Sequence, residues 1–312
     1  MSSSSSPSSS SKKKSTIVRA KRWFAVGTLR TTFRVLEVAA PGPGARWAER
    51  LWLTVPKRPW RPKKPVAVSA GQPFTMTVLR STVHGRLWGE DGPVVYLMHG
   101  WGGTAEQLDA FVEPLLAAGH RVVSFDAPGH GTSTQSLAGP GRSTLPEFSE
   151  TLRCAVDRFG EAHAVIAHSF GAAAAVLAIL DGLPVGRLAV VAPVSDPIGF
   201  SYEFAKMLGF GERIRTGFLR VLEKRVGASM DRFDIPARMS TAALTALPPL
   251  LIVHDLGDRE VPVSHSDRLA AMWPGADLDT WTSLGHFRIL TDPDVVRKVT
   301  AFSSVPRTLL VP

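Results

Sequence analysis

The segment Ala167–Gly171 constrains the fold of this chain more than any other part of the sequence. It lies between a short apolar run, Ala164–Ala167, and an alanine-rich stretch, Ala172–Leu180, that is typical of a helix. A sharp turn from strand to helix strains the backbone of Ser169 and lifts its hydroxyl clear of the sheet edge. Such a turn needs small residues at both ends of the segment. The pattern predicts a nucleophilic serine, although a serine that caps a helix would give a similar pattern.

A glycine-rich segment follows a strand nearer the N-terminus. The apolar run Val94–Met98 is typical of a buried strand, His99–Gly103 follows it, and a helical pattern covers Thr104–Ala118. A loop of this composition lets its backbone approach a ligand, although loop glycines are also common without such a role. We expect the backbone N–H groups of Trp101 and Phe170 to form an oxyanion hole.

Two more candidate residues follow strands in the second half of the chain. The buried run Leu250–Val253 leads into Asp258, and a last strand over Ala276–Thr282 leads into His286. Open α/β sheets place catalytic groups at the carboxyl ends of their strands. We therefore expect His286 to act as the general base for Ser169, with Asp258 holding its imidazole in the required tautomer.

These motifs together resemble those of the α/β-hydrolase superfamily, over about four fifths of the chain from Val66 onward. The matching segments are His99-Gly100-Trp101-Gly102, Asp126-Ala127-Pro128-Gly129-His130-Gly131, Ala167–Gly171, Gly257-Asp258 with Val261-Pro262, and Gly285-His286-Phe287. The order serine, acid, histidine is also that of the superfamily. Ala167 departs from the glycine that is usual at the first position of the serine motif. The resemblance implies an α/β fold with a mostly parallel central sheet flanked by helices.

Two other acidic residues compete with Asp258. Asp255 lies three residues earlier in the same loop, and Asp196 follows the strand predicted over Leu188–Ala192, where some relatives place the acid. The resemblance favours Asp258, because it places the acid three residues before Val261.

The other histidines carry no pattern of metal ligands, and we expect neither a metal nor a cofactor. His99 and His168 are expected to have structural roles. Four further histidines are expected at the surface or at the ends of helices and strands: His84, His120, His163 and His265.

The insertion at about 195–248 resembles the caps of this superfamily, which lie over the nucleophile. Its pattern is helical over Tyr202–Val226, and its apolar residues favour a small to medium apolar substrate. We expect a serine hydrolase that cleaves a carboxylic ester through an acyl-enzyme intermediate. Thioester, amide and carbon–carbon bond cleavage are further options. A receptor-like or scaffold protein with slow or no turnover, and a membrane-associated lipase-like enzyme, are the alternatives.

Positive charge is concentrated at the N-terminus. Residues 1–65 carry 15 Lys and Arg against 2 acidic residues, whereas the rest carries 21 against 25. A serine- and lysine-rich tail over 1–16 is expected to be disordered. The segment 17–65 is predicted to form a basic amphipathic helix over Ile17–Val38 and an extended arm over Pro43–Pro62. The hydrolase domain is expected over 66–312.

Composition suggests few partners besides a small acyl substrate. The basic residues and aromatic side chains form no recognisable nucleic-acid motif, so we expect no nucleic-acid partner. Weak contact of residues 17–36 with a membrane surface is an option, against the simpler packing of the same helix on the domain. The single cysteine, Cys154, and the lack of a long apolar segment favour a cytoplasmic location. The sequence does not predict the oligomeric state.

Overall fold

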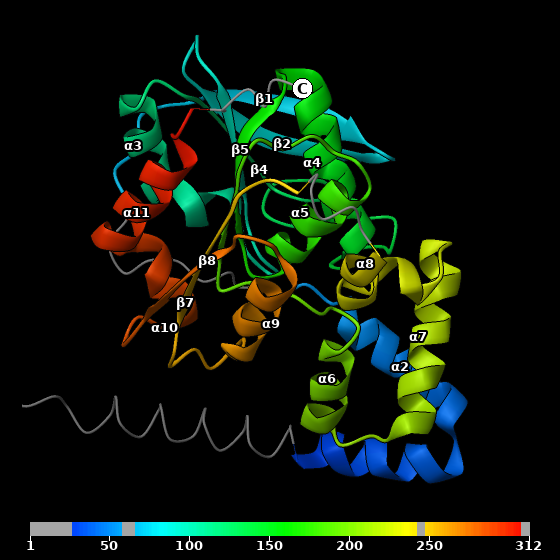
Figure 1. Cartoon of the computed structure of the whole chain (residues 1–312). Helices are drawn as coiled ribbons and strands as arrows, with labels where there is room; N and C mark the ends of the chain where they lie inside the picture. Colours follow the sequence, from blue (N-terminus) through cyan, green and yellow to red (C-terminus); the bar gives the residue numbers. More distant parts are fainter. Residues whose placement is uncertain (1–26, 58–65, 242–246, 307–312) are drawn as a thin grey trace, which may run out of the picture. The chain divides into compact units, whose positions relative to one another are not determined.

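A central sheet of eight strands organises the computed structural model, which describes residues 27–57, 66–241 and 247–306 (Figure 1). The strands are β1 (Gln72–Val78), β2 (Ser81–Trp88), β3 (Val94–Met98), β4 (Arg121–Phe125), β5 (Ala162–His168), β6 (Leu188–Val191), β7 (Leu250–Asp255) and β8 (Asp277–Trp281). Their spatial order is β1-β2-β4-β3-β5-β6-β7-β8. The first two pair antiparallel and β2 pairs antiparallel with β4, while all the remaining pairs are parallel. This is the α/β-hydrolase fold with the mostly parallel sheet that the sequence predicts.

Helices on both faces of the sheet explain why its central strands are continuous apolar runs. Every residue of β3, β6 and β7 is buried, as expected for parallel strands covered on both sides. On one face lie η1 (Ala105–Phe111), α3 (Val112–Ala117) and α11 (Pro293–Ser303), which share a hydrophobic core with the strands. On the other lie α4 (Leu145–Phe159) and α5 (Phe170–Leu180) (Figure 1).

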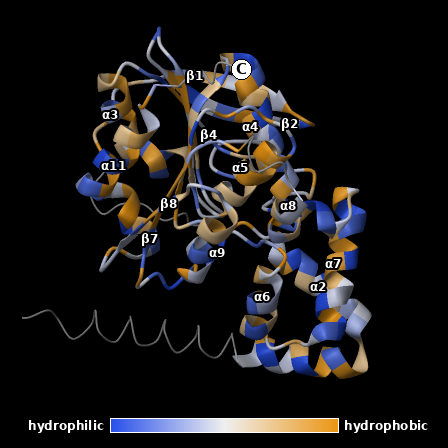
Figure 2. Ribbon diagram, viewed as in Figure 1, coloured by the Kyte–Doolittle hydropathy of each residue, from blue (hydrophilic) through white to orange (hydrophobic). Residues whose placement is uncertain are grey.

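The alanine-rich sequence of α5 fits its buried position. Nine of its residues are buried, among them four consecutive alanines at Ala172–Ala175. Figure 2 shows hydrophobic residues along the central strands and in α5. Small side chains let α5 pack closely against the sheet and against α4. Because α5 begins directly after Ser169, this packing also holds the serine motif in place.

The described residues form two compact units. The first comprises the described part of Met1–Trp52 together with Gly199–Arg225, and the second comprises Leu53–Ile198 and Val226–Pro312 within the described ranges. The first unit contains a helix over 27–39, α2 (Pro41–Trp52), α6 (Phe200–Leu208) and most of α7 (Glu212–Val226). Its core includes Phe33, Ala45, Ala48, Leu208, Ile214 and Phe218. The insertion between β6 and β7 thus divides between the units, and η2 (Met230–Phe233) and α8 (Ile235–Thr241) belong to the second.

Two predictions of secondary structure in these segments are wrong. Pro41–Trp52 is a helix and not an extended arm, because its two prolines lie in the first turn, where a helix tolerates them. A buried carboxylate on this helix, Glu49, also pairs with Arg225 of α7. The single helical pattern over Tyr202–Val226 is broken at Gly209, whose φ of 79° ends α6 in the left-handed conformation.

The remaining predictions near the N-terminus are tested in part. Residues 27–39 are helical, whereas 17–26, and with them the start of the predicted helix, lie outside the described residues, as does the tail over 1–16. The helical pattern over Thr104–Ala118 divides into the 3-10 helix η1 and the short helix α3. Within the described ranges, no helix is both long and apolar enough to span a membrane.

Candidate active site

Ser169 lies in the turn between β5 and α5, at the carboxyl edge of the sheet. Its φ of 53° and ψ of −118° are unusual for a residue with a side chain, so the turn is strained as the sequence pattern predicts. Tight packing keeps this conformation. A Cβ added at Gly100 would lie 2.9 Å from the Cβ of Ser169, and one added at Gly171 would overlap the carbonyl oxygen of His99. The loop after β3 can therefore lie this close to the turn at Ser169 only because residues 100 and 171 are glycines.

His286 and Asp258 come together with Ser169 from two other loops. His286 lies in the short helix α10 (Gly285–Arg288) after β8, and Asp258 lies in the loop after β7. The His286 Nε2 atom is 3.0 Å from Ser169 Oγ, and its Nδ1 atom is 2.7 Å from Asp258 Oδ2. When Nδ1–H donates to the carboxylate, the lone pair of Nε2 faces the serine hydroxyl. We call these three side chains the Ser–His–Asp array.

The carboxylate of Asp258 has donors on both oxygens. Backbone N–H groups of Glu260 and Val261 donate to Oδ1 at 2.8 Å and 3.1 Å. Burial opposes ionisation of this side chain, but hydrogen bonds from His254 and His286 outweigh it and hold the pKa of Asp258 well below its usual range. Asp258 is therefore an anion that orients the imidazole of His286.

The two competing acids have other partners. Asp255 accepts hydrogen bonds from the backbone N–H groups of Gly257 at 2.9 Å and Leu284 at 2.7 Å, which tie its loop to the one that carries His286. Asp196 pairs with Arg268 at 2.8 Å. Only Asp258 among these three carboxylates reaches the imidazole of His286 within the described residues.

The loop His99–Gly103 follows β3 next to the serine. Phe170 is the first residue of α5, so its N–H has no acceptor within that helix. The Trp101 indole donates to the carbonyl of Thr54 at 3.1 Å, and its ring packs edge-on against Phe170 with centroids 5.0 Å apart. These contacts fix the two residues whose N–H groups the sequence predicts to form the oxyanion hole.

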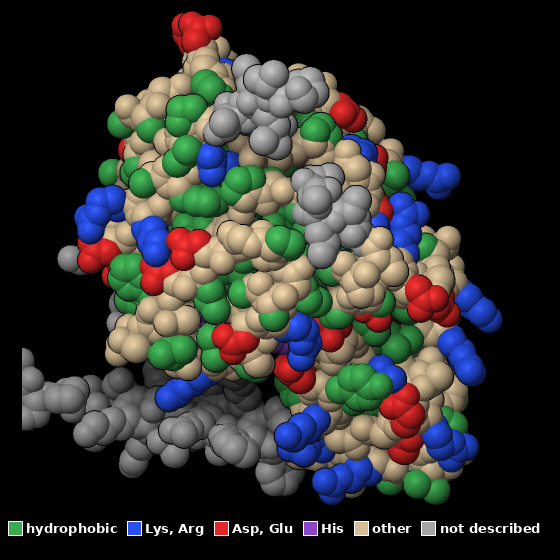
Figure 3. Space-filling model, in the orientation of Figure 1, with side chains coloured by type: hydrophobic (Ala, Val, Ile, Leu, Met, Phe, Trp, Pro, Cys, Tyr) green, Lys and Arg blue, Asp and Glu red, His purple; other side chains and the backbone are tan. Residues whose placement is uncertain are grey.

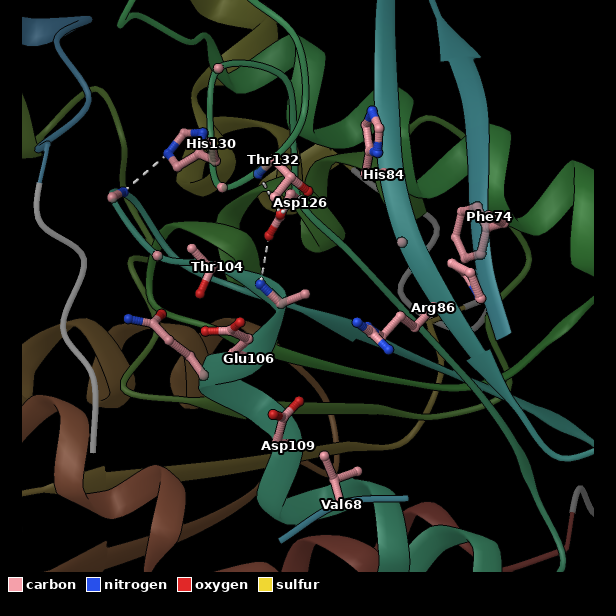
Figure 4. A pocket seen from close by; sticks show the side chains of 18 of the residues that line it. Val68, Phe74, His84, Arg86, Thr104, Glu106, Asp109, Asp126, His130 and Thr132 are labelled. Atoms are coloured by element: carbon pink, nitrogen blue, oxygen red, sulfur yellow. Dashed lines mark hydrogen bonds between the residues drawn. The ribbon is translucent and has the colours of Figure 1, made fainter. Parts of the chain in front are cut away.

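The loop Asp126–Gly131 braces the loop His99–Gly103 from behind. Asp126 accepts from the backbone N–H groups of Ala105 and Thr132, each at 2.8 Å (Figure 4). A Cβ added at Gly131, whose φ is 50°, would overlap that carboxylate, so only glycine fits there. The motif therefore acts by holding neighbouring loops together.

Two buried histidines complete this brace. His130 Nε2 accepts from the N–H of Gly102 at 3.1 Å, and His99 Nε2 accepts from the N–H of Ala127 at 3.0 Å. Each ring must then carry its proton on Nδ1, which lies near a backbone carbonyl oxygen. Burial lowers the pKa of His130 to about 3 and lowers that of His99, so both rings stay neutral. The role of His130 depends on a contact between loops, and sequence reasoning missed it.

His168, just before the serine, supports His286. Its Nε2–H donates to the carbonyl oxygen of His286 at 3.0 Å, and the two rings lie 4.6 Å apart. Complete burial, followed by the charge of His286, lowers the pKa of His168 well below the ordinary value. A neutral His168 adds no positive charge beside the imidazole of His286. Its structural role agrees with the sequence prediction.

A cavity of about 1360 Å³ lies beside this site (Figure 4). Gly102 and Gly103 form part of its wall, and Figure 4 shows Arg86 and Asp109 on opposite sides of it. Burial and the nearby charge of Glu106 raise the pKa of Asp109 to about 6. The three side chains of the Ser–His–Asp array are not among the described residues that line this cavity. The cavity is therefore a feature separate from the array.

Comparison with known proteins agrees with this architecture. The sequence model of the alpha/beta hydrolase family matches residues 94–299. Among curated relatives, the dihydrolipoyllysine-residue acetyltransferase component of the acetoin cleaving system from Pseudomonas putida is 41% identical over 81 residues, which are 26% of this chain and 21% of that protein. A putative carbamate hydrolase, RutD, from Variovorax paradoxus (strain S110) is 26% identical over 258 residues and covers 70% of this chain and 93% of its own length.

A solved structure shows the same fold. Est1E from Butyrivibrio proteoclasticus superposes with a TM-score of 0.57 at 17% identity, covering 75% of this chain and 97% of its own. The chain spans only 21% of the length of the Pseudomonas putida relative, so that the similarity there concerns one part of a longer protein.

Proposed function

We propose, from the premise that this chain belongs to the alpha/beta hydrolase family, that it is a serine hydrolase that cleaves a carboxylic ester or a related acyl bond. The observation that carries the proposal is the array in which Ser169 Oγ lies 3.0 Å from His286 Nε2 while His286 Nδ1 lies 2.7 Å from Asp258 Oδ2. Nucleophilic catalysis by serine needs a base within hydrogen-bond reach and a third group that orients the base.

In the first half of the reaction, Ser169 Oγ attacks the acyl carbonyl while His286 Nε2 takes its proton. The imidazolium that forms is stabilised by the anionic Asp258 carboxylate. His286 then donates the proton to the leaving alcohol or amine, which leaves an acyl group on Ser169. In the second half, His286 takes a proton from the water that attacks the acyl carbonyl. His286 then returns this proton to Ser169 Oγ as the acyl–oxygen bond breaks and the acid leaves.

The negative charge that develops on the carbonyl oxygen needs hydrogen-bond donors. We propose the backbone N–H groups of Trp101 and Phe170 for this role, in agreement with their places after β3 and at the start of α5. Each such donor contributes about 2.7–4 kcal/mol to the stabilisation of the transition state in comparable sites. The brace formed by Asp126 and His130 keeps the loop that carries Trp101 close to the serine.

For the substrate we propose a small to medium apolar acyl ester. The proposal rests on the apolar composition of the insertion at about 195–248. A series of p-nitrophenyl esters of increasing acyl length tests it. We expect kcat/KM to be highest for short and medium chains, and faster turnover of long-chain triglycerides than of short esters would contradict the proposal.

A carbamate or amide bond is the second candidate for the bond that is cleaved. It is favoured by the similarity to the putative carbamate hydrolase, because the alignment covers 93% of that protein. The same array would serve, since the serine attacks a carbonyl carbon in each case. Two p-nitrophenyl substrates with the same leaving group, one an acyl ester and one a carbamate of similar size, decide between the two bonds, and Ser169→Ala is the control that must abolish both activities.

A further inference from the structure

A second histidine lies against the acid of the Ser–His–Asp array. His254 is the fifth residue of β7, and its side chain is completely buried. Its Nε2 atom is 3.0 Å from the carbonyl oxygen of Val261 and 3.4 Å from Asp258 Oδ2. Its Nδ1 atom is 2.6 Å from the hydroxyl of Ser266. The catalytic steps described above make no use of this side chain.

The partners of His254 determine where its proton lies. The carbonyl oxygen of Val261 can only accept, so Nε2 must carry a hydrogen. The Ser266 hydroxyl can donate to Nδ1, which makes the neutral ring compatible with all its contacts. The Nε2–H group then donates to the Val261 carbonyl and also lies within 3.4 Å of the Asp258 carboxylate.

Asp258 Oδ2 therefore faces two imidazole rings. One is His286, whose Nδ1 is 2.7 Å away, and the other is His254 at 3.4 Å. The other carboxylate oxygen is held by the backbone N–H groups of Glu260 and Val261. A carboxylate with a donor on each side of Oδ2 keeps its charge and its orientation, which the base needs.

We propose that His254 is a positioning residue, whose Nε2–H keeps Asp258 Oδ2 directed at His286 Nδ1. The importance of this role for catalysis rests on the proposed serine hydrolase function, whereas the contact itself does not. Without this donor, the charge on Oδ2 is less stabilised and is available to His286 alone. The protonated form of His286 is then favoured, so its titration moves to higher pH.

Other titratable groups surround the array. His168 packs against His286 from the end of β5 with ring centroids 4.6 Å apart, and its pKa is well below the ordinary value because of burial. His265 lies in α9 (Ser264–Met272), close to His254, and burial together with Arg268 lowers its pKa to about 4. Asp255 holds the backbone N–H of Leu284. Both histidines stay neutral at neutral pH, so a change in the titration of His286 there reports on Asp258 and His254.

Three variants of the full chain separate a role at Asp258 from a role in packing. His254→Leu removes the donor. His254→Gln keeps an N–H donor at about the position of Nε2. Ser266→Ala removes the partner on the other side of the same ring and leaves Nε2–H in place. The readout is the titration of the His286 imidazole, followed by NMR on histidine-labelled protein and assigned from the resonance that is lost in His286→Gln.

We expect the titration midpoint of His286 in His254→Leu to rise by about half a pH unit or more, the size of one ordinary hydrogen bond. His254→Gln should restore most of the shift, and Ser266→Ala should titrate like the unmodified chain. An unchanged midpoint in His254→Leu, or equal shifts in all three variants, would overturn the proposal. If His254→Leu does not fold, His254→Met, which also lacks the donor, takes its place: a raised midpoint there with a wild-type midpoint in His254→Gln supports the role, and an unchanged midpoint contradicts it.

The NMR readout needs no substrate, which separates this proposal from the proposed function. Failure of Ser169→Ala to alter ester turnover would overturn the serine hydrolase mechanism while the titration still measures the contact of His254 with Asp258. In an active enzyme, we also expect His254→Leu to lower kcat about 10-fold or more, with the acidic limb of kcat/KM displaced as the His286 titration is. A loss of activity without this displacement would assign His254 to packing alone.

Discussion

Ser169 has a backbone conformation that costs free energy, and packing of the surrounding residues stabilises it. Its φ of 53° is stabilised because β5 and α5 are both buried and because Gly100 lets the loop after β3 approach its Cβ. The sequence could predict that three side chains lie close together, because each follows a strand and the strand ends share one edge: Ser169, Asp258 and His286. The contacts of His130 and His254 could not be predicted in the same way, because they join loops whose separation no local pattern encodes.

Replacing the orienting acid should disable catalysis without unfolding the protein. In Asp258→Asn the amide oxygen still accepts from Glu260 and Val261, but the negative charge beside the imidazole is lost. We expect kcat to fall about 10⁴-fold at neutral pH, as for other arrays of this type. Asp196→Asn, which removes the competing acid that pairs with Arg268, is the matched control and should stay within about 3-fold of the unmodified chain. A larger loss in Asp196→Asn than in Asp258→Asn would contradict the assignment.

The neutral His130 should make the fold sensitive to acid. Its pKa is about 3 in the folded chain against an ordinary 6.5, so the unfolded chain binds a proton that the folded chain refuses. Stability from this group is complete above the unfolded value and is lost as pH falls from 6.5 toward 3, by about 2 kcal/mol at pH 5. His130→Gln can still accept from Gly102 and does not titrate. Urea unfolding at pH 7 and pH 5 should show a smaller loss in this variant, and equal losses would contradict the explanation.

At the scale of elements, the central strands can be predicted from the sequence because both of their faces are buried. The apolar runs at β3, β6 and β7 are continuous because helices cover both sides of these strands. The two wrong predictions of secondary structure involve residue types that are compatible with more than one backbone conformation. Proline is compatible with an extended arm and with the first turn of α2, and Gly209 lies inside an apolar pattern that continues across the break between α6 and α7.

The brace between loops can be tested with a pair of glycines. Gly131 and Gly119 both have positive φ, but a Cβ at Gly131 would overlap the Asp126 carboxylate, whereas one at Gly119 meets nothing within 4 Å. Gly119→Ala should cost only the conformational strain, about 1 kcal/mol. Gly131→Ala should cost more than about 2 kcal/mol in free energy of unfolding and should also lower kcat/KM, because it displaces the loop that supports Trp101. Equal effects of the two substitutions would refute the brace.

At the scale of the whole molecule, charge distinguishes the N-terminal segment from the rest. The described helix over 27–39 exposes Arg30 and Arg34 beside Val35 and Val38, whose exposed fractions are 60% and 77%. Figure 3 shows Lys and Arg side chains spread over the surface of the helices of the first unit. Charge and composition were readable from the sequence, but the packing of helix 27–39 and α2 with α6 and α7 was not, because these segments are far apart in the chain.

We propose that residues 17–36 bind weakly to anionic membrane surfaces. Basic residues next to exposed apolar ones are typical of such contacts. The full chain should co-sediment with vesicles that contain anionic lipid, less at high salt, and not with zwitterionic vesicles. A chain that begins at Gly27 lacks Arg19, Lys21 and Arg22 of this segment and should bind less. Equal partitioning of both chains, or binding that does not depend on lipid charge, would contradict the proposal.

The account depends most on Ser169 being the nucleophile, and covalent labelling tests this directly. The full chain is treated with a fluorophosphonate probe, and the modified residue is mapped by mass spectrometry beside Ser169→Ala that has been shown to be folded. We predict one label per chain, on Ser169, with both labelling and turnover of p-nitrophenyl esters lost in the variant. A folded wild-type chain that takes no label, or that takes the label on another residue, would contradict the serine hydrolase mechanism.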